Sequence, residues 1–290
     1  IFKQFKDLEG EIYSAEVHHI RHNAIILLDD DGIELVLPKS EQIRSDFFRK
    51  GDSVRGVIKS VELRGTKPAI ILSRTSPEFL MKLFEQEIPE VFDGLITIEG
   101  VARIPGEKAK VAVDSYDDRI DPVGACVGMK GSRIHGIVRE LGNENIDVIN
   151  YTKNEQLYIA RALSPAKIVS MEIKPYEEVK DGKKGRVDVF LKPEEVSKAI
   201  GKGGVNIRLA SQLTGYEIDV QREGIEDEDV ELTEFGDEIE GWVIDELKKI
   251  GLDTARSVLE KDVQELLKRT DLEEETILEI QQILKEEFED

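Results

Sequence analysis

Residues 128–134 read Gly-Met-Lys-Gly-Ser-Arg-Ile, and residues 201–207 read Gly-Lys-Gly-Gly-Val-Asn-Ile. Both stretches continue for the length of a helix and then reach the tripeptide Ile-Asp-Val, at residues 146–148 and 218–220. The offset is 73 residues at the glycines and 72 at the tripeptide, so the first copy holds one extra residue. A repeat of this kind predicts two copies of one folding unit.

Each copy shows the same order of expected elements. A pair of strands comes first, a helix follows, and after the glycine loop come a second helix and a last strand. The strand pairs are expected at residues 94–103 with 109–115 and at 169–174 with 185–191, and the helices at 121–127 and 133–141 and at 193–200 and 206–213.

The Gly-x-x-Gly loops suggest a nucleic-acid site. A loop with glycine at both ends lets another backbone approach closely, because neither glycine carries a Cβ atom. The free N–H groups at the start of the next helix attract phosphate. This arrangement is typical of KH domains, whose loop clamps about four nucleotides. The candidate RNA-binding residues are Gly128, Met129, Lys130, Gly131, Ser132 and Arg133 in the first loop, and Gly201, Lys202, Gly203, Gly204, Asn206 and Arg208 in the second.

Two other interpretations of these loops are weaker. The glycines could simply end helices, but two copies, each with basic residues and the same closing strand, favour a binding role. A P-loop is disfavoured because the G-x-x-x-x-G-K-[ST] spacing is missing.

Residues 1–76 predict β structure. Short apolar runs at 11–17, 24–28, 33–37, 53–63 and 69–72 are separated by polar turns. Five such strands suggest a small barrel of the OB type, whose open face binds bases on aromatic rings. Tentative RNA contacts are Tyr13, Arg21, His22, Lys39 and Arg74, whereas Phe47 and Phe48 are expected to pack in the core or at its edge.

The remaining segments change character. Residues 77–90 have helical spacing between Pro77 and Pro89, which predicts a connecting helix. Residues 223–235 are strongly acidic and are expected to form a solvated linker. Residues 236–290 show helical apolar spacing with corners at Gly251 and Asp271, which suggests helix-hairpin-helix pairs.

The formal net charge of −21 does not argue against RNA binding, because it is unevenly distributed. Residues 223–290 carry 7 basic and 25 acidic side chains, whereas residues 161–222 carry 12 and 9, and residues 1–76 carry 12 of each. RNA responds to local charge, within a Debye length of about 10 Å of the phosphates.

Several classes of protein are disfavoured. No apolar run approaches the ~18 residues of a membrane span, and the lone Cys126 fits a reducing cytoplasm. No catalytic constellation is visible, and His18, His19 and His22 lack partners for a metal site. We therefore expect a cytoplasmic, monomeric, non-enzymatic protein without cofactor or metal. Because the chain opens on Ile1 rather than methionine, we expect it to be a fragment.

Three stretches resemble the NusA family of bacterial transcription elongation and termination factors. Residues 121–133 (DPVGACVGMKGSR) resemble its first KH domain, and residues 199–216 (AIGKGGVNIRLASQLTGY) its second. Residues 72–80 (LSRTSPEFL) and 85–90 (EQEIPE) resemble the junction between its S1 and KH domains.

The resemblance implies a multidomain α+β chain. An S1 barrel would occupy residues 1–76, two tandem type II KH domains residues 77–160 and 161–222, and an acidic helix-hairpin-helix-like tail residues 236–290 after the linker. Ile25 stands where S1 domains often carry a stacking phenylalanine. The implied function is binding of single-stranded nascent RNA and modulation of RNA polymerase pausing, termination and antitermination. Polymerase and other transcription factors would be partners of a longer chain, since NusA-like proteins dock on polymerase through an N-terminal domain not present in this sequence.

Three alternatives remain open. An S1 and KH accessory or cap subunit of an RNA-degradation complex would be expected to have one KH unit. Polynucleotide phosphorylase places catalytic domains before its KH and S1 modules. A pure protein-interaction module would not need paired glycine loops, although the tail could be one.

Overall fold

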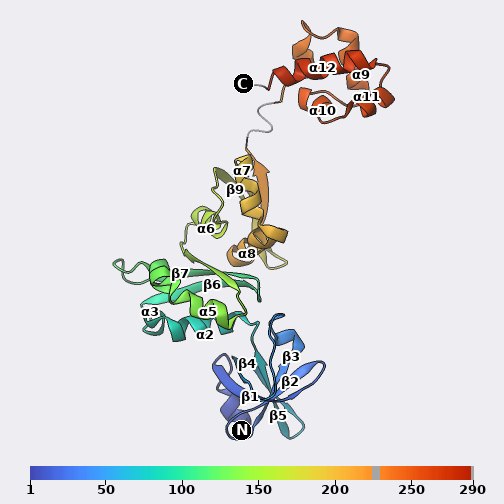
Figure 1. The fold of residues 1–290 in the computed structure, drawn as a ribbon. Coiled ribbons are helices and arrows are strands. Elements are labelled where there is room, and N and C mark those ends of the chain that lie inside the picture. The colour runs from blue at the N-terminus through green and yellow to red at the C-terminus, as the bar shows by residue number, and fades with distance from the viewer. Residues whose placement is uncertain (224–228, 289–290) are drawn as a thin grey trace. The chain divides into compact units, whose positions relative to one another are not determined.

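The computed structural model of the protein describes residues 1–223 and 229–288, so residues 224–228 of the expected linker lie outside it. The chain forms two compact units, Ile1–Gln221 and Arg222–Asp290 (Figure 1). The first unit contains the barrel and both copies of the repeat, and the second contains the acidic helices.

The barrel is built where the sequence predicts it. Its strands are β1 (Ile12–Ile20), β2 (Ala24–Leu28), β3 (Glu34–Pro38), β4 (Ser53–Arg64) and β5 (Lys67–Ser73). They follow the order β1-β2-β3-β5-β4, and an antiparallel ladder between β1 and β4 joins the ends. A short helix, α1 (Phe2–Lys6), which the sequence did not predict, buries Phe5 in the barrel core.

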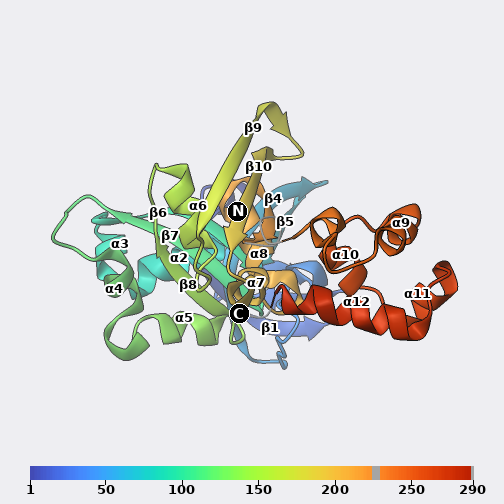
Figure 2. The same ribbon diagram turned by 90° about the horizontal axis from the view of Figure 1, so that it is seen from above.

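The first copy of the repeat forms a three-stranded sheet covered by helices. Its elements are α2 (Pro77–Glu87), α3 (Pro89–Phe92), β6 (Ile96–Ile104), β7 (Lys108–Ser115), α4 (Pro122–Val127), α5 (Ile134–Glu140) and β8 (Asn145–Asn150). The sheet order is β6-β7-β8, and α2, α4 and α5 pack on one face of it (Figures 1 and 2). Ser76 starts α2 by accepting a hydrogen bond from the Glu78 amide, and Pro77 occupies the first helical position.

The second copy repeats this order. Its elements are α6 (Glu155–Ala162), β9 (Ser170–Lys180), β10 (Lys183–Leu191), α7 (Pro193–Ile200), α8 (Val205–Thr214) and β11 (Tyr216–Arg222), with the sheet order β11-β10-β9. After α3 in the first copy and α6 in the second, both copies run strand, strand, helix, helix, strand, which confirms the prediction of two KH units.

The boundary between the two KH units needs a correction. A division after residue 160 would cut α6, whose Ile159 and Ala162 lie in one core with Val187 and Leu191 of β10. The helix also packs on α8. It therefore opens the second unit, and the boundary lies before Glu155.

Neighbouring modules of the first unit share cores. Ile43 and Val57 of the barrel segment pack into the core of the first KH unit. On the opposite face of the first KH sheet, Ala112 and Ile149 pack into the core of the second unit, and α8 lies against β6 and β7. A Cβ atom at Gly100 on β6 would lie 3.0 Å from the Leu213 side chain, so glycine permits this close approach.

The two KH sheets differ on the face that points away from their own covering helices. In β7, Ala112 lies between the inward-facing Val111 and Val113, whereas the corresponding place in β10, between Val187 and Val189, holds Asp188. Asp188 pairs with Lys174 at 3.0 Å and with Arg186 at 3.6 Å, and Arg186 also pairs with Asp219. This sheet face is therefore covered by ion pairs.

The second of the two compact units, which follows Gln221, is a small helical domain. Its elements are η4 (Leu232–Phe235), α9 (Gly241–Lys249), α10 (Ala255–Leu259), α11 (Val263–Arg269) and α12 (Glu274–Glu286). Leu232 and Phe235 are buried in its core, so this end of the expected solvated linker is in fact part of the helical domain. Gly251, with φ +83°, turns the chain between α9 and α10, as the sequence predicts.

Candidate nucleic-acid interface

Both glycine loops have the same backbone geometry. The helix before each loop ends at the first glycine, Gly128 with φ 78° and ψ 172° or Gly201 with φ 76° and ψ 169°. One 3-10 turn follows, Met129–Gly131 or Lys202–Gly204, and then the next helix begins. A Cβ atom at Gly201 would lie 2.7 Å from the Cβ atom of Asn206, so the tight turn excludes other residues at this position.

The tips of the loops face solvent. In the first loop, Met129 is 83% exposed and Lys130 is exposed beside it. In the second loop, Lys202 is exposed. No atom lies within 4 Å of the place where a Cβ atom would stand at Gly203 or Gly204. A sugar-phosphate strand can therefore reach the backbone of the second turn, whereas in the first turn the His135 ring lies 2.8 Å from the place of a Gly131 Cβ atom.

Arg133 and Asn206 occupy matching positions and stabilise the turns from within. Arg133 donates from Nη1 to Glu90 at 2.7 Å and to the Ala125 carbonyl at 2.8 Å. Asn206 is only 2% exposed, and its Nδ2 lies 2.9 Å from the Ala199 carbonyl and 3.2 Å from that of Leu163. The prediction that the Asn206 side chain contacts RNA is therefore wrong, because it is buried as a support for the loop.

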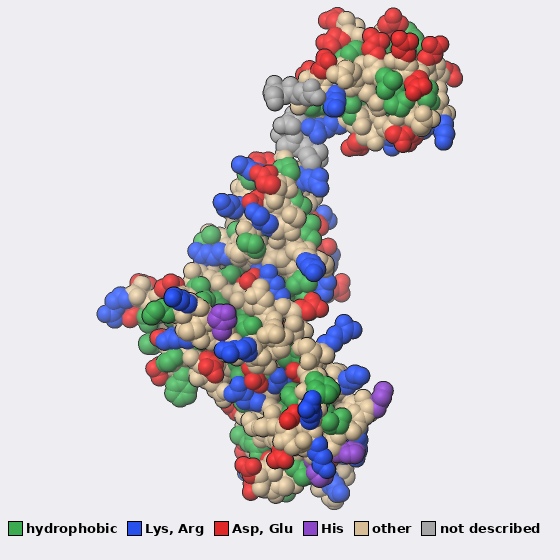
Figure 3. Space-filling view, viewed as in Figure 1, with side chains coloured by type: hydrophobic (Ala, Val, Ile, Leu, Met, Phe, Trp, Pro, Cys, Tyr) green, Lys and Arg blue, Asp and Glu red, His purple; other side chains and the backbone are tan. Residues whose placement is uncertain are grey.

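Exposed basic side chains continue along the helices after the loops. His135 and Arg139 lie on the exposed side of α5, and Arg208 matches His135 on α8. Figure 3 shows Lys and Arg side chains along the visible face of the compact unit that contains the barrel and both KH units, whereas Asp and Glu prevail on the helical domain. Ser132 is exposed next to the first loop. The positive charge thus lies where the turns are accessible.

The structure brings together only three of the five residues that were predicted to contact RNA on the barrel. Arg21, His22 and Lys39 are exposed and line a groove of about 440 Å³, with the buried Ile25 among its lining residues. Tyr13 instead donates its hydroxyl to Asp29 at 2.8 Å, and burial together with this carboxylate raises the pKa of Tyr13 to about 12. Its ring packs edge-on against Phe5 beside the barrel core and is not among the lining residues of the groove.

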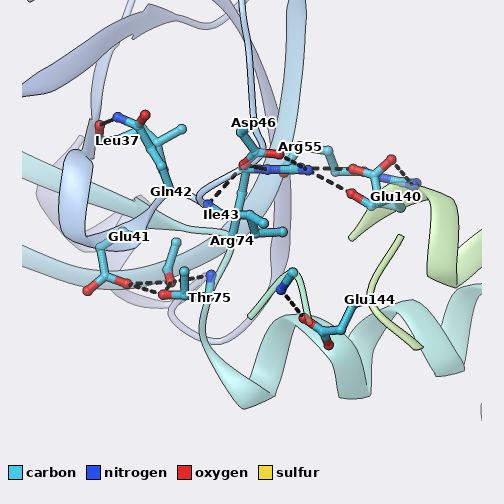
Figure 4. Close-up of polar contacts among 12 residues, drawn as sticks. Leu37, Glu41, Gln42, Ile43, Asp46, Arg55, Arg74, Thr75, Glu140 and Glu144 are labelled. Atoms are coloured by element: carbon cyan, nitrogen blue, oxygen red, sulfur yellow. Dashed lines mark hydrogen bonds and ion pairs between the residues drawn. The ribbon is translucent and has the colours of Figure 1, made fainter. Parts of the chain in front are cut away.

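Arg74 joins two modules rather than contacting RNA. The side chain is 4% exposed and lies between the barrel and α5 (Figure 4). It donates to Asp46 at 2.8 Å, to the Arg55 carbonyl at 2.6 Å and to Glu140 at 2.9 Å. The prediction of an RNA contact here is wrong, because every polar group of the guanidinium faces a protein acceptor.

Phe47 is the residue that sequence reasoning missed. Its side chain is 78% exposed in the groove of Arg21 and Lys39, with the Arg49 guanidinium 5.7 Å from the ring centre. Phe48 alone packs against the barrel core. The signal was available, because neighbouring side chains of an extended segment point to opposite sides, so two adjacent aromatic residues cannot both face inward.

Other kinds of site find less support. In the described parts of the chain, no cluster of His, Cys, Asp and Glu could hold a metal ion. Burial raises the pKa of Cys126 to about 12, so its thiol is unsuited to act as a nucleophile. Among residues 1–223 and 229–288, no helix has the length and apolar character needed to cross a bilayer.

Two KH units in series, each with an exposed Gly-x-x-Gly turn and preceded by a five-stranded barrel, define a tandem KH protein. Residues 74–151 match the model of the NusA-like first KH domain, and residues 155–228 match that of the NusA-like second KH domain. The chain belongs to the NusA family.

Three relatives are each called transcription termination/antitermination protein NusA. The chain is 37% identical over 238 residues to that of Thermus thermophilus, which is 82% of this chain and 60% of the relative. It is 39% identical to that of Halalkalibacterium halodurans and 37% identical to that of Bacillus subtilis, each over 77% of this chain. These two alignments cover 56% and 58% of the relatives, so the chain spans somewhat more than half of their length.

Proposed function

We propose that this chain binds single-stranded RNA through its two KH loops, and that the protein containing it modulates pausing, termination and antitermination of transcription. The observation that carries the proposal is the pair of glycine turns, which share one backbone geometry and expose their tips beside basic side chains. The names of the three relatives support the role in transcription.

The mechanism of binding follows from the turns. A phosphate passes over the glycine backbone, where no Cβ atom intervenes, while Lys130 or Lys202 supplies positive charge. Buried side chains such as Asn206 hold the turn in this shape in the absence of RNA. Less conformational entropy is therefore lost when RNA binds. Phosphate contacts carry no sequence preference of their own, so any preference must come from contacts with the bases.

The number of KH units favours a transcription regulator over the alternative function. The alternative, an accessory or cap subunit of an RNA-degradation complex, predicts a single KH unit, whereas two are present. We expect the protein to act in the cytoplasm as a monomer, with RNA polymerase and other transcription factors as partners of the longer protein.

The test is fluorescence anisotropy of labelled single-stranded RNA with the parent protein, Gly131→Asp and Gly204→Asp across a salt series. Each substitution places a negative charge where a phosphate should pass. Gly32→Asp is the matched control for Gly204→Asp, because both glycines have a positive φ and open space around them, but Gly32 lies in the turn between β2 and β3. At Gly131 a Cβ atom would lie 2.8 Å from the His135 ring, so the folding check applies above all to Gly131→Asp.

We expect the parent to bind RNA with an affinity that falls as salt rises, and both loop variants to bind less tightly while Gly32→Asp binds like the parent. Circular dichroism verifies that all variants are folded. Equal binding by the parent and both loop variants would rule out the KH loops as the RNA site.

A further inference from the structure

We infer that Phe47 is the centre of a base-stacking subsite that extends the RNA path from the first KH loop across the junction onto the barrel. The inference rests on the proposed function and adds a location, a chemistry and a footprint to it. Phe47 lies where two hollows of the first unit meet, since it lines both.

The first hollow is the barrel groove, of about 440 Å³. Its basic lining residues are Arg21, His22, Lys39, Arg49 and Lys50, and Asp46 is its single acid. None of Arg21, Lys39, Arg49 and Lys50 takes part in an ion pair among the residues that the structure describes, so their charge is available to phosphates.

The second hollow is a cleft of about 450 Å³ between the barrel and the first KH unit. Ser14, Ser45 and Ser53 line it from the barrel segment, and Arg139 lines it from α5. Arg139 is exposed, whereas the neighbouring Arg74 and Glu140 are engaged with each other. Arg139 therefore remains the cation of α5 that can reach a strand in this cleft.

Helix α5 connects this cleft to the first glycine loop. The helix begins three residues after Gly131, and from Ile134 at its start to Arg139 near its end it rises by roughly 7.5 Å. His135 is exposed between them, one turn before Arg139. The second KH unit has no such continuation, because the residue of α8 that matches Arg139 is the uncharged Gln212.

An exposed phenylalanine ring among cations suits an unpaired base. Base stacking on an aromatic side chain is tolerant of sequence, and the surrounding cations neutralise the flanking phosphates. Duplex RNA would offer no free base face to the ring. A basic protein segment is disfavoured because the groove is itself basic.

The experiment compares two RNA lengths. One oligomer of about 8 nucleotides suffices for two KH loops at about four each, and one of about 18 nucleotides extends beyond them. We would measure both with the parent, Phe47→Ala, Phe47→Trp and the control Tyr116→Ala. Tyr116 is 81% exposed, like Phe47, but lies beside Asp114, Asp117 and Asp118.

We expect Phe47→Ala to weaken binding of the long RNA by about five- to a hundredfold and to leave the short RNA unchanged. Phe47→Trp restores the long-RNA affinity, and Tyr116→Ala behaves like the parent. With 2-aminopurine scanned along the long RNA, one position outside the KH-bound segment should be quenched by the parent and not by Phe47→Ala.

The outcomes separate the two proposals. If Phe47→Ala binds the long RNA like the parent while Gly131→Asp does not, the stacking subsite is refuted and the KH proposal stands. An equal loss for short and long RNA would also refute an extension of the path. If the parent binds neither RNA, the proposed function itself fails.

Discussion

Arg74, at the end of the barrel, makes two hydrogen bonds to Glu140, the last residue of α5. Its Nη1 donates to the Glu140 carboxylate at 2.9 Å, and its Nη2 donates to the Glu140 carbonyl at 2.7 Å. A cation at this position also satisfies a free carbonyl at the helix end and lies in the favourable end of the helix dipole. The barrel and the first KH unit are thus joined by one buried guanidinium.

Removal of this guanidinium should be costly. Arg74→Ala leaves the nearly buried Asp46 without its partner, and breaking a buried ion pair in this way costs about 3–5 kcal/mol of unfolding free energy. Urea denaturation of residues 1–223 measures the loss. Arg119→Ala is the control, since the Arg119–Asp117 pair is exposed and its removal should leave the midpoint in place. Equal midpoints for Arg74→Ala and the parent would contradict this account.

The packing of the barrel segment against the first KH unit requires a glycine at position 142. A Cβ atom at Gly142 would lie 2.5 Å from Oγ of Ser45, a barrel residue. Gly142→Ala should therefore cost about 1–3 kcal/mol more in unfolding free energy than Gly32→Ala. Gly32→Ala introduces only the strain of a positive φ, about 1–2 kcal/mol, because open space surrounds it.

A double-mutant cycle identifies the contact behind this difference. Ser45→Gly should restore the stability that Gly142→Ala loses beyond Gly32→Ala, should leave the strain of the positive φ in place, and should change the stability of the parent little. Additive effects in the cycle would mean that the clash with Ser45 is not the cause.

Asn206 should matter for the second KH loop without touching RNA. Asn206→Ala leaves buried carbonyls of α7 and of the Leu163 segment without a donor, at about 1–3 kcal/mol. Hydrogen exchange should show faster opening of α7 and of the turn. Lys202→Ala, on the exposed tip, should keep these protection factors and instead reduce the slope of affinity against salt by about one. Unchanged exchange in Asn206→Ala would count against its supporting role.

Acid should weaken the barrel through Glu41. Burial alone would raise the pKa of this carboxyl, but hydrogen bonds from Lys59, Ser73 and Thr75 outweigh it and hold the pKa below its ordinary value of 4.5. The stabilisation is therefore complete above that value and is lost as the pH falls through the folded-state pKa. Glu41→Gln should be less stable than the parent at neutral pH, and the difference should shrink on acidification. A difference that is constant between neutral pH and pH 3 would exclude this titration.

Local patterns explain why much of the fold could be predicted. The barrel strands are marked by alternation and polar turns, and the helices around the glycine loops by their spacing and by Pro193. Such signals depend on residues close together in the chain. The helix at 155–162 was not predicted and shows the limit, because its apolar side is buried against β10 and α8, which come later in the chain.

Partners distant in the chain explain what could not be predicted at the site. Arg74 is 66 residues from Glu140, and Asn206 is 43 residues from Leu163, so a basic or polar residue type alone suggested RNA contacts that protein groups occupy. For Phe47 and Phe48, the sequence contains both rings, but the path of the loop between β3 and β4 decides which one is buried.

The ion pairs on the outer face of the second KH sheet have a consequence for assembly. In a stack of repeats, the last repeat must end on a polar face, or the apolar seam would continue into a further copy. Ala112 and Ile149 offer such a seam in the first unit and are already covered. Asp188, with Lys174 and Arg186, ends it in the second. This polar sheet face is therefore a poor template for the stacking of a third repeat and for head-to-tail polymers of the protein.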